Sequence, residues 1–125
     1  MKTASYFTYR GPGRIGISVG NPRGIPAGYR MFKPLAPTRA MLHLDCPTYR
    51  MVYFRDILNQ LDPAQVMEQI EKLAQDAEPV LLCFEKPPFT PANWCHRRIV
   101  ADWFQETLGL DVPEYLPERT NDLFE

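Results

Sequence analysis

The sequence contains no long hydrophobic run and few cysteines. Its longest aliphatic run extends from Val80 to Phe84, whereas a membrane helix needs roughly 20 apolar residues. No apolar segment follows Lys2, so we expect neither a signal peptide nor membrane association. The three cysteines are an odd number, which disfavours a disulfide framework. We therefore predict a cytoplasmic protein whose cysteines are free thiols.

Signatures of phosphate loops and of dinucleotide-binding motifs are also missing. The glycines at positions 11, 13 and 16 have a suitable spacing. However, Pro12 and the alternation of Ile15, Ile17 and Val19 predict a strand where such a motif requires the start of a helix. The sequence therefore gives no support to these two classes of nucleotide-binding protein.

Charge is nearly balanced overall but unevenly distributed. The net charge is −1, yet residues 1–50 hold eight Lys or Arg and a single acidic residue, Asp45, for a net charge of +7. Residues 51–125 have a net charge of −8. A basic half can receive an anion such as nucleic acid, or it can pair with the acidic half across the surface. The sequence leaves both interpretations open.

The length of 125 residues, with 45% hydrophobic and 23% charged residues, suits one globular domain. We expect that domain to span residues 1–125, with an acidic C-terminal extension over residues 110–125. The 13 prolines are about twice the usual share. They predict short elements joined by rigid loops.

Hydrophobic periodicity and turn residues predict the strands. Three strands are expected over residues 4–9, 15–19 and 41–44, and a long loop is expected over residues 20–40. Residues 79–84 form a continuous apolar run bounded by proline. Such a run is typical of a strand buried on both faces of a sheet.

Capping residues predict three helices. The first follows Thr48 and ends near Leu61. The second covers residues 63–77, with Asp62 as its N-cap and a proline at its first position. The third covers residues 94–108, with Asn93 as its N-cap and a glycine at its end.

Chemically reactive residues follow the buried strand. Cys83 and Glu85 lie at its carboxyl end, and Cys95, His96 and Arg97 lie in the first turn of the next helix. In open α/β sheets, ligands bind at the carboxyl ends of strands, and a helix N-terminus favours anions. A thiol in that first turn, beside positive side chains, has a lowered pKa and is a candidate nucleophile.

Structural explanations remain open for the same residues. Cys83 lies within an apolar strand and suits core packing, and Cys95 can be a packing residue as well as a nucleophile or a redox thiol. Arg97 and Arg98 point in different directions on a helix, so at most one is expected to enter the site. Glu85 can be a general base or the ion-pair partner of Arg97.

A metal site is another interpretation of the cysteines and histidines. His43 and Cys46 have a ligand-like spacing, but structural zinc sites use paired short spacings, and a second pair is missing. Cys95 and His96 are neighbours, about 100° apart on a helix, which makes joint ligation awkward. We therefore predict no bound metal and no cofactor.

The paired motif resembles a known family. Residues 81–86 read Leu-Leu-Cys-Phe-Glu-Lys, and residues 95–97 read Cys-His-Arg. Together they resemble the LLCxE…CHR signature of the DUF488 family of small prokaryotic proteins. Residues 5–7, 35–37 and 101–103 resemble the shorter branch of that family. The resemblance implies a compact α/β fold, which we expect to be a three-layer domain with a central, largely parallel sheet flanked by helices.

The resemblance supplies no reaction, because the family's function is unknown. From the chemistry of the residues we predict an enzyme that acts on an anionic ligand, such as a nucleotide or a nucleic acid component. The predicted roles are catalytic for Cys95, His96 and Glu85, anion-binding for Arg97, Arg98 and Asn93, and supporting for Cys83 and Tyr6. The alternatives are a non-catalytic protein that binds nucleic acid or nucleotides, and a protein-interaction module.

Overall fold

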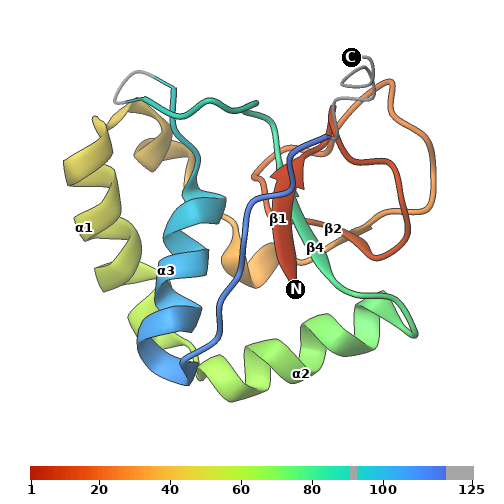
Figure 1. Cartoon of the computed structure of the whole chain (residues 1–125). Coiled ribbons are helices and arrows are strands. Elements are labelled where there is room, and N and C mark those ends of the chain that lie inside the picture. Colours follow the sequence, from red (N-terminus) through yellow and green to blue (C-terminus); the bar gives the residue numbers. More distant parts are fainter. Residues whose placement is uncertain (91–92, 118–125) are drawn as a thin grey trace, which may run out of the picture.

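The computed structural model describes residues 1–90 and 93–117 (Figure 1). A parallel sheet in the order β1-β4-β2-β3 forms its centre. The strands are β1 (Lys2–Ser5), β2 (Arg14–Gly16), β3 (Arg30–Met31) and β4 (Val80–Cys83). The α-helices are α1 (Cys46–Asp56), α2 (Pro63–Ala74) and α3 (His96–Leu108), and short 3₁₀ helices cover Lys33–Leu35, Arg39–His43 and Leu58–Gln60. The predicted α/β fold with a parallel sheet is confirmed.

β4, the last strand in sequence among the described residues, lies in the middle of the sheet. It pairs with β1, where Thr3 lies opposite Leu81, and with β2, where Ile15 lies opposite the same residue. All four residues of β4 are buried. The continuous apolar run therefore forms a strand covered on both faces, as predicted.

The two faces of the sheet pack against different layers. Leu81, Ile15 and Ile17 face the larger core, which α1, α2 and α3 complete. The opposite face carries a smaller cluster covered by loop residues, and its members are Ala4, Tyr6, Val80 and Leu82 with Tyr9, Ile25 and Tyr115. The alternation along each strand follows from the two-residue period of side chains. It directs Cys83, two residues after Leu81, toward the helical layer.

The helix boundaries follow local capping. Asp62 accepts from the Ala64 amide and caps α2, as predicted. For α1 the predicted start is wrong: Asp45 is the N-cap, and its carboxylate accepts from the amide of Thr48. Gly109 ends α3 in the left-handed conformation, with φ 64°, which glycine adopts without a steric penalty.

Three of the predicted strands are wrong in extent or type. The strand expected over residues 15–19 is β2, which ends at Gly16. β1 stops at Ser5, whose carbonyl accepts from Thr8 and closes a turn. Residues 41–44 form no strand, because the 3₁₀ helix Arg39–His43 occupies most of them. β3 lies within the predicted loop over residues 20–40, and it has only two residues, too few to show a pattern.

The C-terminal segment returns to the sheet. A single parallel bridge joins Glu114 to Thr3, and the Tyr115 amide donates to the Thr3 carbonyl. Residues 118–125 of the predicted acidic extension lie outside the described residues. Within residues 1–90 and 93–117, none of the helices combines the length and hydrophobicity needed to cross a membrane.

Candidate functional site

The candidate site lies at the carboxyl edge of the sheet, where parallel α/β folds bind their ligands. β1 ends there at Ser5 and β4 ends there at Cys83. The N-terminus of α3 meets the same edge, because Cys95 is bonded to Cys83. The sequence motif around residues 81–86 and the motif around residues 95–97 therefore come together, as the resemblance implied.

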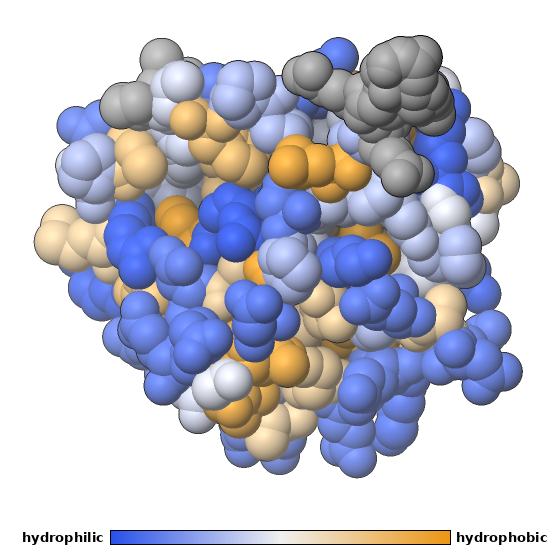
Figure 2. All heavy atoms as spheres, viewed as in Figure 1, coloured by the Kyte–Doolittle hydropathy of each residue, from blue (hydrophilic) through white to orange (hydrophobic). Residues whose placement is uncertain are grey.

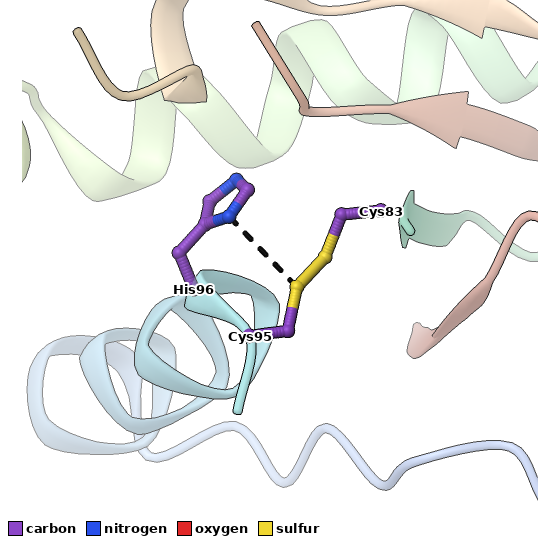
Figure 3. A group of neighbouring side chains, drawn as sticks. All are labelled: Cys83, Cys95 and His96. Carbon is purple, nitrogen blue, oxygen red and sulfur yellow. Dashed lines mark hydrogen bonds between the residues drawn. A yellow bond between two sulfur atoms is a disulfide. The ribbon is translucent and has the colours of Figure 1, made fainter. Parts of the chain in front are cut away.

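Cys83 and Cys95 form a disulfide across this edge (Figure 3). The prediction of free thiols is therefore wrong for these two residues, although Cys46 is free. An odd number of cysteines does not distinguish three free thiols from one pair and one free thiol. The pair forms because the loop after β4 returns the start of α3 to the end of the same strand, so that residues 12 apart in sequence meet.

The N-cap of α3 is Cys95, so the prediction that Asn93 caps this helix is wrong. The Asn93 side-chain amide donates to the carbonyls of Lys86 and Pro88, at 2.8 and 2.9 Å, and thereby holds the preceding loop. Cys95 has extended backbone angles, φ −143° and ψ 143°. Its side chain makes no capping hydrogen bond with the first turn of the helix, because its sulfur is bonded to Cys83.

His96 is buried next to the disulfide. Its Nε2 lies 2.7 Å from the carbonyl oxygen of Ile17, and because a carbonyl can only accept, Nε2 carries the proton of the neutral ring. The other nitrogen, Nδ1, lies 3.9 Å from the Cys95 sulfur (Figure 3). Burial lowers the pKa of His96 to about 4. The ring is therefore neutral at pH 7 and presents an unprotonated nitrogen to the sulfur.

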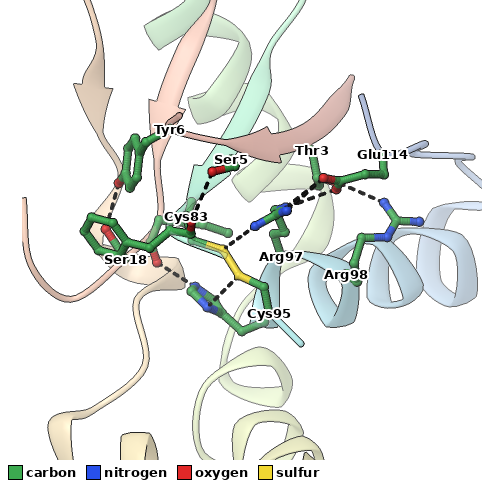
Figure 4. The surroundings of a disulfide bond; sticks show 12 residues. Thr3, Ser5, Tyr6, Ser18, Cys83, Cys95, Arg97, Arg98 and Glu114 are labelled. Carbon is green, nitrogen blue, oxygen red and sulfur yellow. Dashed lines mark hydrogen bonds and ion pairs between the residues drawn. A yellow bond between two sulfur atoms is a disulfide. The ribbon is translucent and has the colours of Figure 1, made fainter. Parts of the chain in front are cut away.

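Arg97 is fully buried and contacts both a sulfur and a carboxylate (Figure 4). Its Nη1 donates to the Cys83 sulfur at 3.2 Å. Its Nε and Nη2 donate to the two carboxylate oxygens of Glu114, at 3.0 and 2.8 Å, and Glu114 also accepts from the Thr3 hydroxyl. Of the two roles open to Glu85, that of ion-pair partner of Arg97 belongs to Glu114. The neutralised guanidinium still directs an N–H group at sulfur.

Arg98 is also used inside the protein. Its Nη1 donates to the Thr3 hydroxyl and to the Val112 carbonyl, both at 2.8 Å. Arg97 and Arg98 together fasten the chain near Glu114 to β1 and α3. The expectation that these two arginines and Asn93 bind an anionic ligand stays a prediction.

Glu85 is exposed and lines two adjoining pockets. One pocket, of about 390 Å³, reaches Cys95 and is lined in part by aromatic side chains. The other, of about 230 Å³, reaches Cys83. His96 and Glu85 line both pockets. Each cysteine of the disulfide thus lines one of the two pockets, and the same histidine and carboxylate line both.

Tyr6 lies just after β1 and supports the edge from the loop-covered face. Its hydroxyl is 2.7 Å from the Ser18 hydroxyl, and its ring lies 4.9 Å from the ring of Phe84. Burial raises the pKa of the Tyr6 phenol. A side chain at Gly16 would collide with the Tyr6 hydroxyl and with Met31, so the close approach requires glycine at that position. Tyr6 therefore joins the ends of β1, β2 and β4.

The comparison with family models decides the family. The model described as "Domain of unknown function DUF488" matches residues 21–104. The chain belongs to the DUF488 family. Comparisons with curated proteins and with solved structures give no match.

The DUF488 match contains most of the site but not all of it. It includes Cys83, Cys95, His96 and Arg97, whereas Glu114 lies beyond its end. Sequence reasoning also missed Glu114, which stands in an acidic segment with no motif around it. The only available signal was the need of Arg97 for a carboxylate partner if the arginine was buried.

One group of potential metal ligands is present in the described part of this DUF488 chain. The sulfurs of Cys83 and Cys95 and a ring nitrogen of His96 all lie within 4.8 Å of one another, and all three residues are buried. His43 and Cys46, the spacing considered in the sequence, are not members of the group. These are the same groups that meet in the disulfide site, where the two sulfurs are bonded and His96 Nδ1 lies near the Cys95 sulfur.

Proposed function

We propose that this DUF488 protein is a thiol–disulfide oxidoreductase that acts on a low-molecular-weight disulfide. The observation that carries the proposal is the bonded pair of Cys83 and Cys95, set between two pockets that share Glu85 and His96. It favours the redox role among the roles predicted for Cys95. A pocket of about 390 Å³ is within the usual range for small-molecule sites. A reducing compartment, such as the predicted cytoplasm, would return the pair to thiols.

The reaction uses the two cysteines in sequence. The Cys95 thiolate attacks one sulfur of the substrate disulfide, and the other substrate sulfur leaves as a thiolate. The Cys83 thiolate then attacks the Cys95 sulfur of the mixed disulfide and releases the second substrate thiolate. The protein loses two electrons and forms its internal disulfide. The substrate gains two electrons and becomes two thiols by taking up the two protons that the cysteines lost.

The neighbouring residues have roles that fit this sequence of steps. Cys95 is the attacking residue because it lines the larger pocket and stands at the N-cap of α3, where free N–H groups favour a thiolate. His96 Nδ1, which carries no proton, is placed to accept a hydrogen bond from the Cys95 thiol of the reduced protein. The Arg97 N–H directed at Cys83 stabilises the second thiolate. Glu85, exposed in both pockets, is placed to orient the bound substrate.

The proposal predicts different fates for the cysteines in a single-turnover experiment. Pre-reduced protein is mixed with a small aromatic disulfide that releases a coloured thiolate, and the products are identified by mass spectrometry. The wild-type protein is expected to release two thiolates rapidly and to form the Cys83–Cys95 bond. Cys83→Ser is expected to stop at a mixed disulfide on Cys95, because the second attack is lost. Cys95→Ser is expected to lose the rapid phase.

Cys46→Ser is the matched control, since Cys46 lies outside the pair, and its rapid phase is expected to equal that of the wild type. The assay contains a chelator, so that bound metal ions do not affect it. A rapid phase that disappears in Cys46→Ser, or a Cys83→Ser protein with no adduct on Cys95, would show that the proposal is wrong.

Nucleic-acid binding without catalysis is a second candidate function, favoured by arginines in the basic half. Arg10, Arg23, Arg30 and Arg39 are exposed, and none of them forms a salt bridge with another described residue. Arg14 differs, because it is buried and donates to the carbonyls of residues 26 and 27. The free charges suit phosphate contacts more than ion pairing between the two halves.

This second function predicts a steep dependence of binding on salt. With about four phosphate contacts, a plot of the logarithm of the binding constant against the logarithm of the salt concentration is expected to have a slope of about −3 to −4. Fluorescence anisotropy of a labelled oligonucleotide measures it. The double variant Arg23→Gln/Arg39→Gln is expected to halve the slope, whereas Arg55→Gln, whose arginine pairs with Asp56, leaves it unchanged. Absence of binding at low salt excludes this function.

The third alternative, a protein-interaction module, has less support. The face shown in Figure 2 carries its hydrophobic residues in small groups between hydrophilic ones. Exposed large apolar residues include Leu42, Met51 and Leu116, which come from separate segments. Interaction surfaces usually have a larger continuous apolar patch.

A further inference from the structure

We propose that the reduced protein binds one zinc ion, or a similar thiophilic metal ion, through Cys83, Cys95 and His96. The fourth coordination position of the ion faces the pocket that contains Glu85. This goes beyond the exchange reaction proposed above, since it requires only that a reductant open the disulfide. Metal binding and disulfide formation then exclude each other at the same sulfurs.

The positions of the ligand atoms suit a tetrahedral ion. Two thiolates and an imidazole bind zinc at about 2.3 and 2.0–2.1 Å, so neighbouring ligand atoms stand roughly 3.5–4 Å apart. Here all three atoms lie within 4.8 Å of one another, and the two sulfurs, which are bonded to each other in this structure, must separate to reach that spacing. The Cα atoms of Cys83 and Cys95 are 7.2 Å apart, beyond the usual disulfide range of about 4.4–6.8 Å. Once the sulfurs are separated, this spacing leaves room for an ion between them.

The orientation of His96 is the one that metal-binding histidines adopt. Such residues donate their second ring N–H to a carbonyl or a carboxylate, which fixes the tautomer and the ring. His96 Nε2 makes this contact with the Ile17 carbonyl, 2.7 Å away, and Nδ1 faces the Cys95 sulfur (Figure 3). The nitrogen that remains free for a metal therefore points at the other ligands.

The objection from sequence, that adjacent residues on a helix diverge by about 100°, does not apply. Cys95 is the N-cap and has extended backbone angles, so it is not on the helical surface. Its sulfur and the His96 ring consequently reach the same space. The nearby charge of Arg97 is balanced by two hydrogen bonds to Glu114, which removes most of its repulsion toward a cation.

The ligand set selects the metal and leaves one position open. Two thiolates and an imidazole favour zinc or another thiophilic ion over magnesium or calcium. Among the described residues the group has three members, the number that catalytic zinc sites use beside a water molecule. Oxidation by a low-molecular-weight disulfide would take two electrons from the two thiolates, form the Cys83–Cys95 bond and release the ion. The disulfide, with two protons, would become two thiols.

Cobalt provides the test, because Co²⁺ in a tetrahedral thiolate site gives a sulfur-to-metal charge-transfer band and strong visible absorption. The protein is reduced with a phosphine, freed of reductant without oxygen, and titrated with Co²⁺ and then with Zn²⁺. We expect one Co²⁺ per reduced chain, displaced by Zn²⁺, and none on the oxidised chain. Cys83→Ser, Cys95→Ser and His96→Asn are each expected to weaken binding by more than about 100-fold, since even loss of an outer-shell partner costs 10–100-fold.

Cys46→Ser and His43→Asn are the matched controls and are expected to bind Co²⁺ as the wild type does, because neither residue belongs to the group. Circular dichroism establishes that each variant is folded. The proposal is overturned if the reduced, folded wild type shows no thiolate band, or if the control variants lose binding as strongly as the ligand variants. The exchange assay contains a chelator, so its result does not depend on metal binding. The Co²⁺ titration contains no disulfide substrate, so its result does not depend on the exchange reaction.

Discussion

Glu114→Gln is expected to destabilise the protein by about 3–5 kcal/mol, the usual effect of removing one partner of a buried ion pair. Arg97 has no exposed surface and the Glu114 side chain is only 12% exposed. The variant would leave the guanidinium charge buried without a counter-charge. The amide oxygen of glutamine still accepts hydrogen bonds, but its NH₂ group only donates, so the amide cannot replace a carboxylate whose two oxygens receive two donor groups of the arginine. Urea denaturation of the disulfide-intact protein measures the change in the free energy of unfolding.

Asp102→Asn is the matched control for this experiment. It removes a carboxylate from an ion pair with Arg50 in which both side chains are largely exposed. Exposed pairs contribute about 0–1 kcal/mol, so we expect a correspondingly small change. The double variant Arg97→Met/Glu114→Leu should recover part of the loss, because it removes both buried charges. Equal effects of Glu114→Gln and Asp102→Asn would contradict the electrostatic explanation.

Lowering the pH from about 6.5 to about 4 is expected to reduce stability by about 3 kcal/mol through His96 alone. Its pKa is lowered from 6.5 to about 4 in the folded protein, chiefly by burial. Between these values the unfolded chain binds more protons than the folded chain, so protons favour unfolding. The stability contributed by the neutral ring is complete above pH 6.5 and is lost as the pH falls toward 4.

The measurement is the free energy of unfolding of the oxidised, metal-free protein at a series of pH values. His96→Gln keeps a donor for the Ile17 carbonyl but does not titrate, so its stability should vary much less over this range. His43, which is exposed, supplies the control variant His43→Gln, whose pH profile should match the wild type. If the profiles of His96→Gln and the wild type have the same slope, another group causes the pH dependence.

The parts of the fold that the sequence predicts well are those with strong local signals. The apolar run that forms β4 and the Asp62 cap of α2 can each be recognised from a few neighbouring residues in the sequence. β3 cannot be recognised in this way, because its two residues form a strand only by pairing with Ile15 and Gly16 of β2. The start of α3 was misplaced for a related reason: Asn93 has the residue type of a cap but is used by the loop before the helix.

The site was predictable as a set of residues and not as a set of contacts. The strand–loop–helix pattern placed Cys83 and Cys95 at one edge of the sheet, and the family resemblance pointed to the same residues. Which atoms meet depends on segments far away in the chain. The partner of His96 is the carbonyl of Ile17, the residue after β2, and the partner of Arg97 is the carboxylate of Glu114. No pattern in the sequence around His96 or Arg97 predicts either contact.

The central place of β4 has a consequence for synthesis of the chain. β1 and β2 are made early but pair with each other nowhere, because β4 lies between them. A nascent chain therefore carries strand edges without partners until β4 has been translated. Such edges are prone to association with other chains, and contacts between distant residues form slowly. We expect a chaperone that shields those edges to raise the yield of native protein.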